Sequence, residues 1–263
     1  MADLKDNWGD GNPYEYFMGR WSKLIAPHFL TWLDPKPSLK WLDIGCGTAA
    51  LSEVIYNTTN PISLTGIDPS EGFIELAKRR IKQVDFQVGD ALNLPFNNLT
   101  FDTIVSGLAI NFFPDLHQSL IEMQRVSKKD ACIAAYVWDY SGKMEFLRYF
   151  WDAASSLDKK ANAFDEGLRF PICSKENLEN AFSKAGLKEI VVDVIDIETL
   201  FTSFNDYWNP FLGGQGPAPA YLASINEVKR SALKNKLYDS LTFETDGSIK
   251  LIGRALAVKG KSK

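Results

Sequence analysis

The sequence predicts an α/β fold with a mostly parallel β-sheet and helices on both of its faces. Two observations carry this prediction. Along the first half of the chain, short apolar runs alternate with segments of helical periodicity. One of these runs, residues 40–44, ends in the turn Gly45–Cys46–Gly47, and a helix is expected to begin directly after it. A strand, a glycine turn and a helix in this order form a ligand-binding unit in many α/β sheets.

The composition fits a globular protein that acts on small molecules. The chain has 263 residues, which is enough for one large domain with insertions. Hydrophobic residues make up 45% of the sequence and aromatic residues 13%. Its net charge of −4 argues against a nucleic-acid surface, which needs clustered lysine and arginine. The sequence has neither an apolar run of membrane-spanning length nor a signal-peptide pattern. We expect a cytoplasmic protein that binds no nucleic acid and does not insert into a membrane.

The cysteines and histidines predict no disulfide and no metal site. Cys46, Cys132 and Cys173 are odd in number and far apart, and the chain has two histidines. The pattern indicates reduced, mostly buried thiols. Without a Cys-x-x-Cys pair, a structural metal centre is not expected.

The chain is expected to begin with an interrupted aromatic helix that extends to Leu33. Asn12 is placed to cap it, Pro13 to occupy its first position and Glu15 to complete a capping box. Gly19 and Pro27 are expected to interrupt the helix. The aromatic residues of this segment either cover the sheet or help to enclose a ligand.

The glycine turn at the end of the first strand carries the most specific signal. Gly45 and Gly47 allow positive φ and leave bare main chain for a ligand, toward which the helix at 49–57 directs its unpaired N–H groups. A Gly-x-Gly sequence is also a common tight turn. Asp43 narrows the choice of ligand, because a carboxylate beside the turn repels a pyrophosphate and attracts an amine.

The second and third strands are predicted at 62–67 and 85–88, and an acid follows each of them. Asp68 lies about 20 residues beyond the glycines, where a carboxylate can accept hydrogen bonds from ribose hydroxyls. Alternatively, Asp68 caps the helix at 72–80, unless Ser70 does so. Asp90 follows the third strand in a Gly-Asp pair that by itself indicates only a turn.

The remaining elements follow from apolar runs and capping residues. Strands are predicted at 101–105, 131–138, 190–197 and 251–258, and helices from Asp115, over 174–185 and over 219–239. Between them, residues 139–172 and 201–228 break the alternation and are rich in aromatic residues. These aromatics either contact a planar, apolar substrate or pack against each other.

Two motifs of the sequence resemble those of one enzyme family. Asp-Ile-Gly-Cys-Gly-Thr (43–48) is similar to the first motif of the class I S-adenosylmethionine-dependent methyltransferases, and Phe-Asp-Thr-Ile-Val-Ser (101–106) is similar to their fourth. The resemblance covers residues 14–136 closely and only the strand pattern beyond. It implies a Rossmann-like sheet of seven strands, mostly parallel with an antiparallel last strand, and helical cap insertions. It also implies S-adenosylmethionine as cofactor and S-adenosylhomocysteine as product.

The resemblance assigns cofactor contacts to residues of this chain. Asp90 would accept a hydrogen bond from the adenine amino group, and the backbone N–H of Ala91 would meet a ring nitrogen. Arg20 lies in a segment, 16–22, similar to one that covers the methionine end, and would pair with the cofactor carboxylate; a surface salt bridge is the alternative. The complete expected set is Arg20, Asp43, Gly45, Cys46, Gly47, Asp68, Pro69, Asp90, Ala91, Leu92 and Ser106. Ala49 departs from the glycine common in the family, without an expected loss of binding.

The expected organisation is a single methyltransferase domain over residues 1–263. Its parts are an N-terminal helical lid (1–34), a cofactor-binding core (38–138), two helical cap insertions (139–172 and 201–228), and the C-terminal part of the sheet (173–200 and 229–260).

The expected activity is methyl transfer to a small-molecule acceptor of aromatic or apolar character. The sequence identifies neither a catalytic base nor the acceptor atom, and His117 falls on a helix where an exposed position is expected. An Asn-Pro-Pro-Tyr motif is absent, which argues against methylation of nucleic-acid base amines. The alternatives are a non-catalytic S-adenosylmethionine-binding regulator and a nicotinamide-dependent dehydrogenase.

Overall fold

The computed structural model describes residues 15–213 and 216–263, which form two compact units. The glycine turn and the strands around it belong to unit 2. Both predicted insertions belong almost entirely to unit 1, together with the described residues that precede Ser22. Unit 1 comprises Met1–Trp21, Asp139–Pro171 and Asp196–Arg254, and unit 2 comprises Ser22–Trp138, Ile172–Ile195 and Ala255–Lys263.

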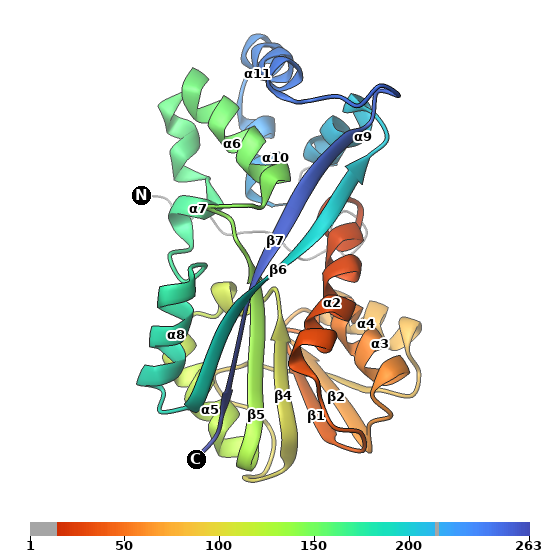
Figure 1. Cartoon of the computed structure of the whole chain (residues 1–263), viewed down its shortest axis with the longest axis vertical. Coiled ribbons are helices and arrows are strands. Elements are labelled where there is room, and N and C mark those ends of the chain that lie inside the picture. The colour runs from red at the N-terminus through yellow and green to blue at the C-terminus, as the bar shows by residue number, and fades with distance from the viewer. Residues whose placement is uncertain (1–14, 214–215) are drawn as a thin grey trace. The chain divides into compact units, whose positions relative to one another are not determined.

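A seven-stranded sheet runs through the chain in the order β3-β2-β1-β4-β5-β7-β6 (Figure 1). Strands β1 to β5 are parallel, and β7 pairs with β5 in antiparallel fashion. This is the sheet expected from the sequence. The strands are β1 (Lys40–Ile44), β2 (Ser63–Asp68), β3 (Asp85–Val88), β4 (Phe101–Gly107), β5 (Ser127–Trp138), β6 (Lys188–Phe201) and β7 (Ile249–Lys261).

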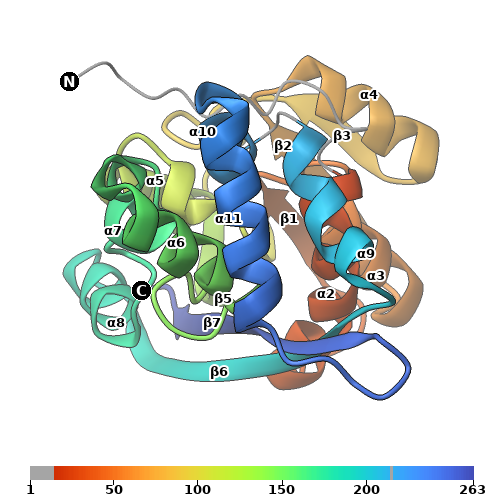
Figure 2. The ribbon, with the colours of Figure 1, turned by 90° about the horizontal axis from the view of Figure 1, so that it is seen from above.

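Helices cover both faces of the sheet in unit 2 (Figures 1 and 2). One face carries α2 (Arg20–Leu33), α3 (Ala50–Thr58) and α4 (Glu71–Arg80), and the other carries α5 (Leu116–Val126) and α8 (Lys175–Lys184). The predicted caps are present: Asp115 accepts a hydrogen bond from Gln118 N at 3.0 Å, and Ser174 accepts one from Asn177 N at 3.2 Å.

The N-terminal helix is continuous across Pro27. A short π-helical segment (Glu15–Gly19) leads into α2, and Pro27 lies inside α2, so the predicted break is wrong. Burial of Ile25, Phe29 and Leu33 on one face of α2 outweighs the hydrogen bond lost at the proline. The predicted cap at Asn12 and Pro13 lies outside the described residues.

The insertions of unit 1 are helical, as expected. The first contains α6 (Glu145–Leu157), the 3₁₀ helix η3 (Lys159–Ala163) and α7 (Glu166–Arg169). The second contains α9 (Phe204–Trp208), η4 (Asn209–Gly213) and α10 (Pro217–Ser224). The single helix predicted over 219–239 is wrong. The chain instead forms α10 and then α11 (Glu227–Ser240), which begins anew because Asn226 caps it through Lys229 N at 3.0 Å.

The aromatic residues of the insertions form a hydrophobic core of unit 1. Phe150 stacks on Phe211 at a centroid distance of 4.4 Å, and Phe146 lies 4.7 Å from Phe211. Phe17, from the segment before α2, contacts both Phe146 and Phe211. All four rings are at most 2% exposed. For the insertion rings Phe146, Phe150 and Phe211, the second interpretation is therefore correct: they pack against each other.

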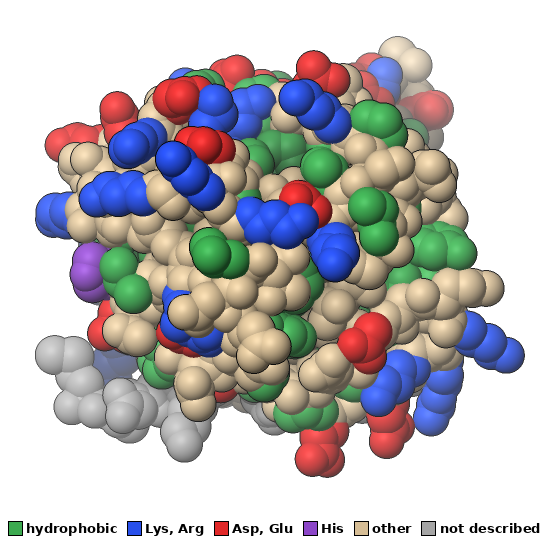
Figure 3. Space-filling model, turned by 90° about the horizontal axis from the view of Figure 1, so that it is seen from below, with side chains coloured by type: hydrophobic (Ala, Val, Ile, Leu, Met, Phe, Trp, Pro, Cys, Tyr) green, Lys and Arg blue, Asp and Glu red, His purple; other side chains and the backbone are tan. Residues whose placement is uncertain are grey.

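Basic and acidic side chains are interspersed on the face of the molecule in Figure 3. Near the first residues of β4 and β5, Lys128 pairs with Asp102 at 2.6 Å, and Lys261, the last residue of β7, pairs with Glu189 near the start of β6 at 2.5 Å. The lysines in these pairs are therefore partly neutralised, in line with the slightly acidic net charge.

Within residues 15–213 and 216–263, no helix combines the length and the apolar character needed to cross a membrane.

Candidate active site

Four neighbouring parallel strands of unit 2 end at one edge of the sheet and deliver the predicted site residues there. Asp43 is paired with Val105 in the register of β1 and β4, and Asp68 with Val88 in that of β2 and β3. Because parallel strands end at the same edge, Asp43, Asp68 and Ser106 lie along it, with Asp90 just beyond β3. This is where open α/β sheets bind their ligands.

The turn after β1 has the conformation that only glycine adopts easily. Gly45 has φ 69° and Gly47 has φ 53°. The N–H groups of Gly45 and Cys46 both donate to the Ile67 carbonyl, at 2.8 and 3.0 Å, which ties the turn to β2. A Cβ added to Gly47 would meet no atom within 4 Å, so bare main chain faces open space there.

Helix α3 begins without a side-chain cap. Ala49 occupies the cap position with φ 69° and makes no side-chain hydrogen bond. The first N–H groups of α3 thus lack a capping side-chain oxygen, which Ser70 provides for α4 and Asp115 for α5. An uncapped N-terminus of a helix attracts a carboxylate through its N–H groups and its dipole. The departure from the family at Ala49 is compatible with this arrangement.

Asp43 is a fully buried carboxyl group with an unused oxygen. Its Oδ2 accepts a hydrogen bond from Ser52 Oγ at 2.6 Å, whereas Oδ1 has no partner. Burial raises the pKa of Asp43 to about 7, and the charge of Asp68 adds to this, while the bond from Ser52 opposes it. A ligand ammonium beside Oδ1 would satisfy the oxygen and favour the ionised form.

The raised pKa of Asp43 predicts that the ligand-free protein loses stability as pH rises. The folded state holds this proton up to about pH 7, whereas an unfolded Asp releases it near 4, so stability falls between these values. This rise in the pKa corresponds to a loss of at most about 4 kcal/mol in the free energy of unfolding. Thermal melts at pH 5 to 8 should therefore show a flatter profile for Asp43→Asn. Parallel profiles for the two proteins would contradict the prediction.

Asp68 connects the glycine turn with the start of α4. Its Oδ2 accepts from Gly47 N at 3.0 Å, and its Oδ1 accepts from Ser70 N at 2.9 Å. Ser70, and not Asp68, caps α4 through Phe73 N at 3.3 Å. Each carboxylate oxygen therefore keeps a free lone pair. Burial raises the pKa of Asp68, and the two backbone bonds oppose that rise. Pro69, which follows it, is exposed.

The loop after β3 is held by interactions that the sequence does not indicate. Asp90 is exposed and its Oδ1 accepts from Leu92 N at 2.9 Å, which closes a turn. Glu122 of α5 accepts from Leu94 N at 2.9 Å, and Arg125 donates to the Leu94 carbonyl at 2.8 Å. These two α5 residues pair with each other at 2.7 Å. Ala91 is buried and Leu92 is half-buried between these anchors.

Cys46 and Ser106 contribute differently to the site. The Cys46 side chain is buried toward β2, where a Cβ on Gly66 would approach its Sγ within 3.1 Å. Burial raises the pKa of this thiol well above its usual value, so the residue is unreactive, and its main chain forms the turn. Ser106 is fully buried and its Oγ has no hydrogen-bond partner.

Arg80 and Ser52 also support the turn and were not expected. Arg80, at the end of α4, donates to the Thr48 carbonyl at 2.6 Å. Ser52 binds Asp43 from the first turn of α3. The only sequence signal for the bond between Ser52 and Asp43 is a serine in the first turn of α3, on the side toward β1. His117 is exposed on α5, as expected.

Arg20 belongs to unit 1 and has partners there. Its Nη1 donates to Asp206 Oδ1 at 2.9 Å, and its Nη2 donates to the Leu200 carbonyl at 2.9 Å. The guanidinium also lies over the rings of Trp21 and Phe201, 4.2 and 5.2 Å from their centroids. These contacts agree with the salt-bridge alternative, and the pairing of Arg20 with a cofactor carboxylate stays a prediction.

Comparison with known proteins identifies the same region. A family model described as a methyltransferase domain matches residues 42–135, which include the turn and most of the predicted contacts. A demethylmenaquinone methyltransferase of Bacillus cereus is 30% identical over 181 residues, covering 61% of this chain and 74% of the relative. One from Staphylococcus epidermidis is 27% identical over 187 residues, covering 65% of this chain and 76% of the relative.

A solved structure shares the fold. The phosphoethanolamine N-methyltransferase 2 of Haemonchus contortus, in complex with S-adenosylhomocysteine, superposes with a TM-score of 0.59 at 16% identity. The match covers 95% of this chain and 56% of that one. The motifs, the sheet order and these relatives agree, and the chain belongs to the class I S-adenosylmethionine-dependent methyltransferases.

Proposed function

We propose that the enzyme transfers the methyl group of S-adenosylmethionine to a small-molecule acceptor at the carboxyl edge of β1 and β4. The observation that carries the proposal is the unsatisfied Oδ1 of Asp43, a fully buried carboxylate oxygen beside a glycine turn. An unpaired buried polar atom destabilises the free protein, and a ligand ammonium would relieve that cost.

The residues of unit 2 fit the cofactor from end to end. Asp43 would accept from its ammonium, and the uncapped N-terminus of α3 would bind its carboxylate. Asp68 would accept from the ribose hydroxyls with the lone pairs that Gly47 and Ser70 leave free. The loop of Asp90, Ala91 and Leu92 would enclose the adenine. Cys46 would contribute main chain, Pro69 an exposed ring, and Ser106 its free hydroxyl.

The chain contributes to the reaction mainly by positioning. The bound cofactor supplies a sulfonium methyl group that an acceptor atom attacks in line. The tied glycine turn and the anchored loop after β3 hold fixed positions, and such alignment can remove up to roughly 7–11 kcal/mol from the barrier. A base is needed only for an acceptor that arrives protonated. His117 is exposed on α5, and we assign it no role.

The relatives suggest the size and character of the acceptor. Those reported above are named for demethylmenaquinone, a small molecule with a ring system. We infer an apolar, planar acceptor for this enzyme as well. The buried rings of the unit 1 core do not support this inference, because they are occupied by each other. Phe112 and Phe113, half-buried after β4, are the aromatic residues that support it.

Calorimetry with Asp68→Ala tests the proposed cofactor site. We expect this variant to bind S-adenosylhomocysteine about 1–3 kcal/mol more weakly than the wild-type protein, since ribose hydroxyls would lose their acceptor. Ser70→Ala is the matched control: it removes the cap of α4, at a cost of about 1 kcal/mol in stability, and leaves Asp68 in place. Equal affinities of Asp68→Ala and Ser70→Ala for S-adenosylhomocysteine would contradict the ribose role.

A further inference from the structure

Ala49 holds a backbone conformation that its own side chain disfavours. The residue precedes α3 with φ 69° and ψ 30°, in the left-handed region. For an L-residue this conformation brings the Cβ close to the carbonyl oxygen that follows, so an alanine adopts it only where its surroundings favour it. Glycine would meet no such penalty. A neighbouring group must therefore offset the strain at Ala49.

The side chain of Arg80 binds the peptide group in front of Ala49. Its Nη1 donates to the Thr48 carbonyl at 2.6 Å, and its Nε lies 3.4 Å from Oε2 of Glu53 in the first turn of α3. The guanidinium thus joins the residue before Ala49 to the helix after it. The Arg80 side chain is only 22% exposed, so this charge-assisted hydrogen bond is largely shielded from water.

The bond to the Thr48 carbonyl fixes the φ of Ala49. With α3 in place, rotation about the N–Cα bond of Ala49 turns the whole preceding peptide group, which is planar, and moves the Thr48 oxygen. An alanine that relaxed to negative φ would therefore direct this oxygen away from Arg80. The N–H group of the same peptide, that of Ala49, donates to the Cys46 carbonyl at 2.9 Å. Both polar groups of the peptide thus hold Ala49 in the left-handed form.

The orientation of this peptide group affects the proposed carboxylate site. The N–H groups of Ala50 and Leu51 open α3 and have no carbonyl four residues before them within the helix. The glycine turn is anchored separately, because Asp68 accepts from Gly47 N at 3.0 Å. Ala49 is the link between the anchored turn and the helix. A change in its φ would therefore misalign the two parts that are proposed to bind the cofactor.

We propose that Arg80 is a positioning residue for the cofactor: it holds the strained Ala49 in the left-handed conformation and so aligns the start of α3 with the glycine turn. The inference rests on the proposed function, because it takes the amino-acid end of the cofactor to bind there. Arg80 acts through the backbone, since its Nη1 and Nε are directed at protein groups. Without Arg80, Ala49 would mostly populate conformations that do not bind, and the measured affinity would fall in proportion to the competent fraction.

Calorimetry with S-adenosylhomocysteine tests the proposal in two backgrounds. Arg80→Met should bind about tenfold more weakly than the wild-type protein, as expected from the strain of an alanine at this φ. In the Ala49→Gly background the same substitution should weaken binding only about twofold, because glycine populates positive and negative φ about equally. Ala49→Gly alone should stay within about twofold of the wild-type affinity. Equal losses in the two backgrounds would show that Arg80 does not act through Ala49 and would overturn the proposal.

Arg79→Met is the matched control on the same helical turn. The Arg79 side chain is 75% exposed and pairs with Glu75 at 3.4 Å, so its removal should leave the affinity unchanged. Arg80→Lys replaces the planar fork with an ammonium and should recover only part of the affinity; it provides the same two-background comparison if Arg80→Met does not fold. Wild-type affinity in Arg80→Met, or an equal loss in Arg79→Met, would overturn the proposal.

Adenosine and the ligand-free protein separate the proposal from its alternatives. Adenosine lacks the amino-acid end, so Arg80→Met should change its affinity by less than about twofold, and losses equal to those for S-adenosylhomocysteine would assign Arg80 to the fold as a whole. A crystal structure of ligand-free Arg80→Met should show Ala49 outside the left-handed region, and an unchanged φ would overturn the proposal. Failure of the wild-type protein to bind S-adenosylhomocysteine would instead reject the proposed function.

Discussion

Replacing Gly45 with alanine should destabilise the protein by about 2–5 kcal/mol. The new Cβ would lie 2.5 Å from that of Ala109, a separation at which one of the two segments must move. Overpacking of this kind costs about 1–3 kcal/mol, and an alanine at a φ of 69° adds about 1–2 kcal/mol. Urea unfolding followed by circular dichroism measures the loss.

Gly47→Ala is the control for this substitution, because it shares the backbone conformation without the contact. Gly47 has φ 53°, but a Cβ there meets no atom within 4 Å. We expect a loss of about 1–2 kcal/mol in stability. The space that the Cβ enters is the space proposed for the cofactor, so affinity for S-adenosylhomocysteine should fall as well. If Gly47→Ala destabilised the fold as much as Gly45→Ala, the contact with Ala109 would not be the cause.

The strands and the glycine turn were predictable because their signals are local. An apolar run followed by glycines determines a strand and a turn within ten residues, and β1 has the predicted bounds, Lys40–Ile44. Capping by Asp115 and Ser174 is equally local, since each bonds an N–H group three residues ahead. The same kind of signal was overlooked at Asn226, which caps α11 and divides the helix predicted over 219–239.

The partners of buried polar groups were not predictable, because they come from distant parts of the chain. Asp206, which pairs with Arg20, is 186 residues away in sequence. Glu122 and Arg125 hold a loop about 30 residues before them, and nothing in their own helix indicates it. The sequence therefore predicts which residues end at the carboxyl edge of the sheet. It does not predict which of their polar atoms are left unpaired, and those atoms carry the functional argument.

The bounds of the last two strands were underestimated for a related reason. Strand β6 spans Lys188–Phe201 and β7 spans Ile249–Lys261, and both are longer than predicted. Their outer parts belong to unit 1, where Thr199 and Phe201 are fully buried. The sequence indicated two insertions in one domain. It could not indicate that these insertions build a hydrophobic core of their own.

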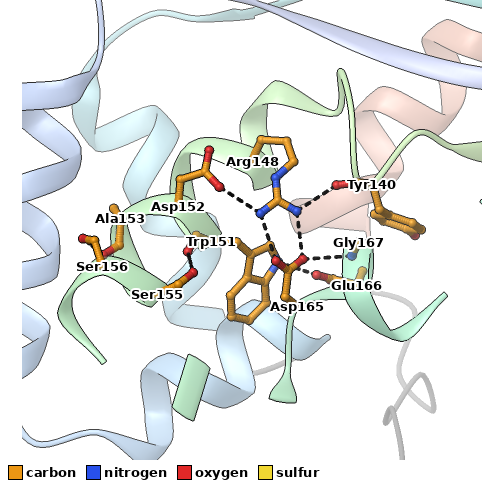
Figure 4. Close-up of polar contacts among 10 residues, drawn as sticks. All are labelled: Tyr140, Arg148, Trp151, Asp152, Ala153, Ser155, Ser156, Asp165, Glu166 and Gly167. Atoms are coloured by element: carbon orange, nitrogen blue, oxygen red, sulfur yellow. Dashed lines mark hydrogen bonds and ion pairs between the residues drawn. The ribbon is translucent and has the colours of Figure 1, made fainter. Parts of the chain in front are cut away.

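Removing the carboxylate of Asp165 should destabilise unit 1 by about 3–5 kcal/mol. Arg148 of α6 binds both oxygens of Asp165 at 2.9 Å and the Tyr140 carbonyl at 3.0 Å (Figure 4). The Asp165 side chain is only 6% exposed, and that of Arg148 is 16% exposed. Asp165→Ala would leave the largely buried Arg148 with the exposed Asp152 as its remaining carboxylate partner, and the loss of the buried partner of such an ion pair has this magnitude. The same substitution removes the hydrogen bond that Asp165 accepts from Gly167 N at 2.8 Å.

Asp152 provides the control for this prediction on the same arginine. It binds Arg148 Nη2 at 3.1 Å, but its side chain is 75% exposed, so Asp152→Ala should change stability by less than about 1 kcal/mol. Urea titration of both variants, followed by circular dichroism, measures the difference. The indole of the buried Trp151 donates to Glu166 and joins the segment of Asp165 to α6, so both belong to the region whose unfolding is compared (Figure 4). The proposed cofactor contacts, apart from Arg20, lie in unit 2, so each folded variant should bind S-adenosylhomocysteine with wild-type affinity. Equal destabilisation by the two substitutions would show that burial does not determine how much the Arg148–Asp165 pair contributes to stability.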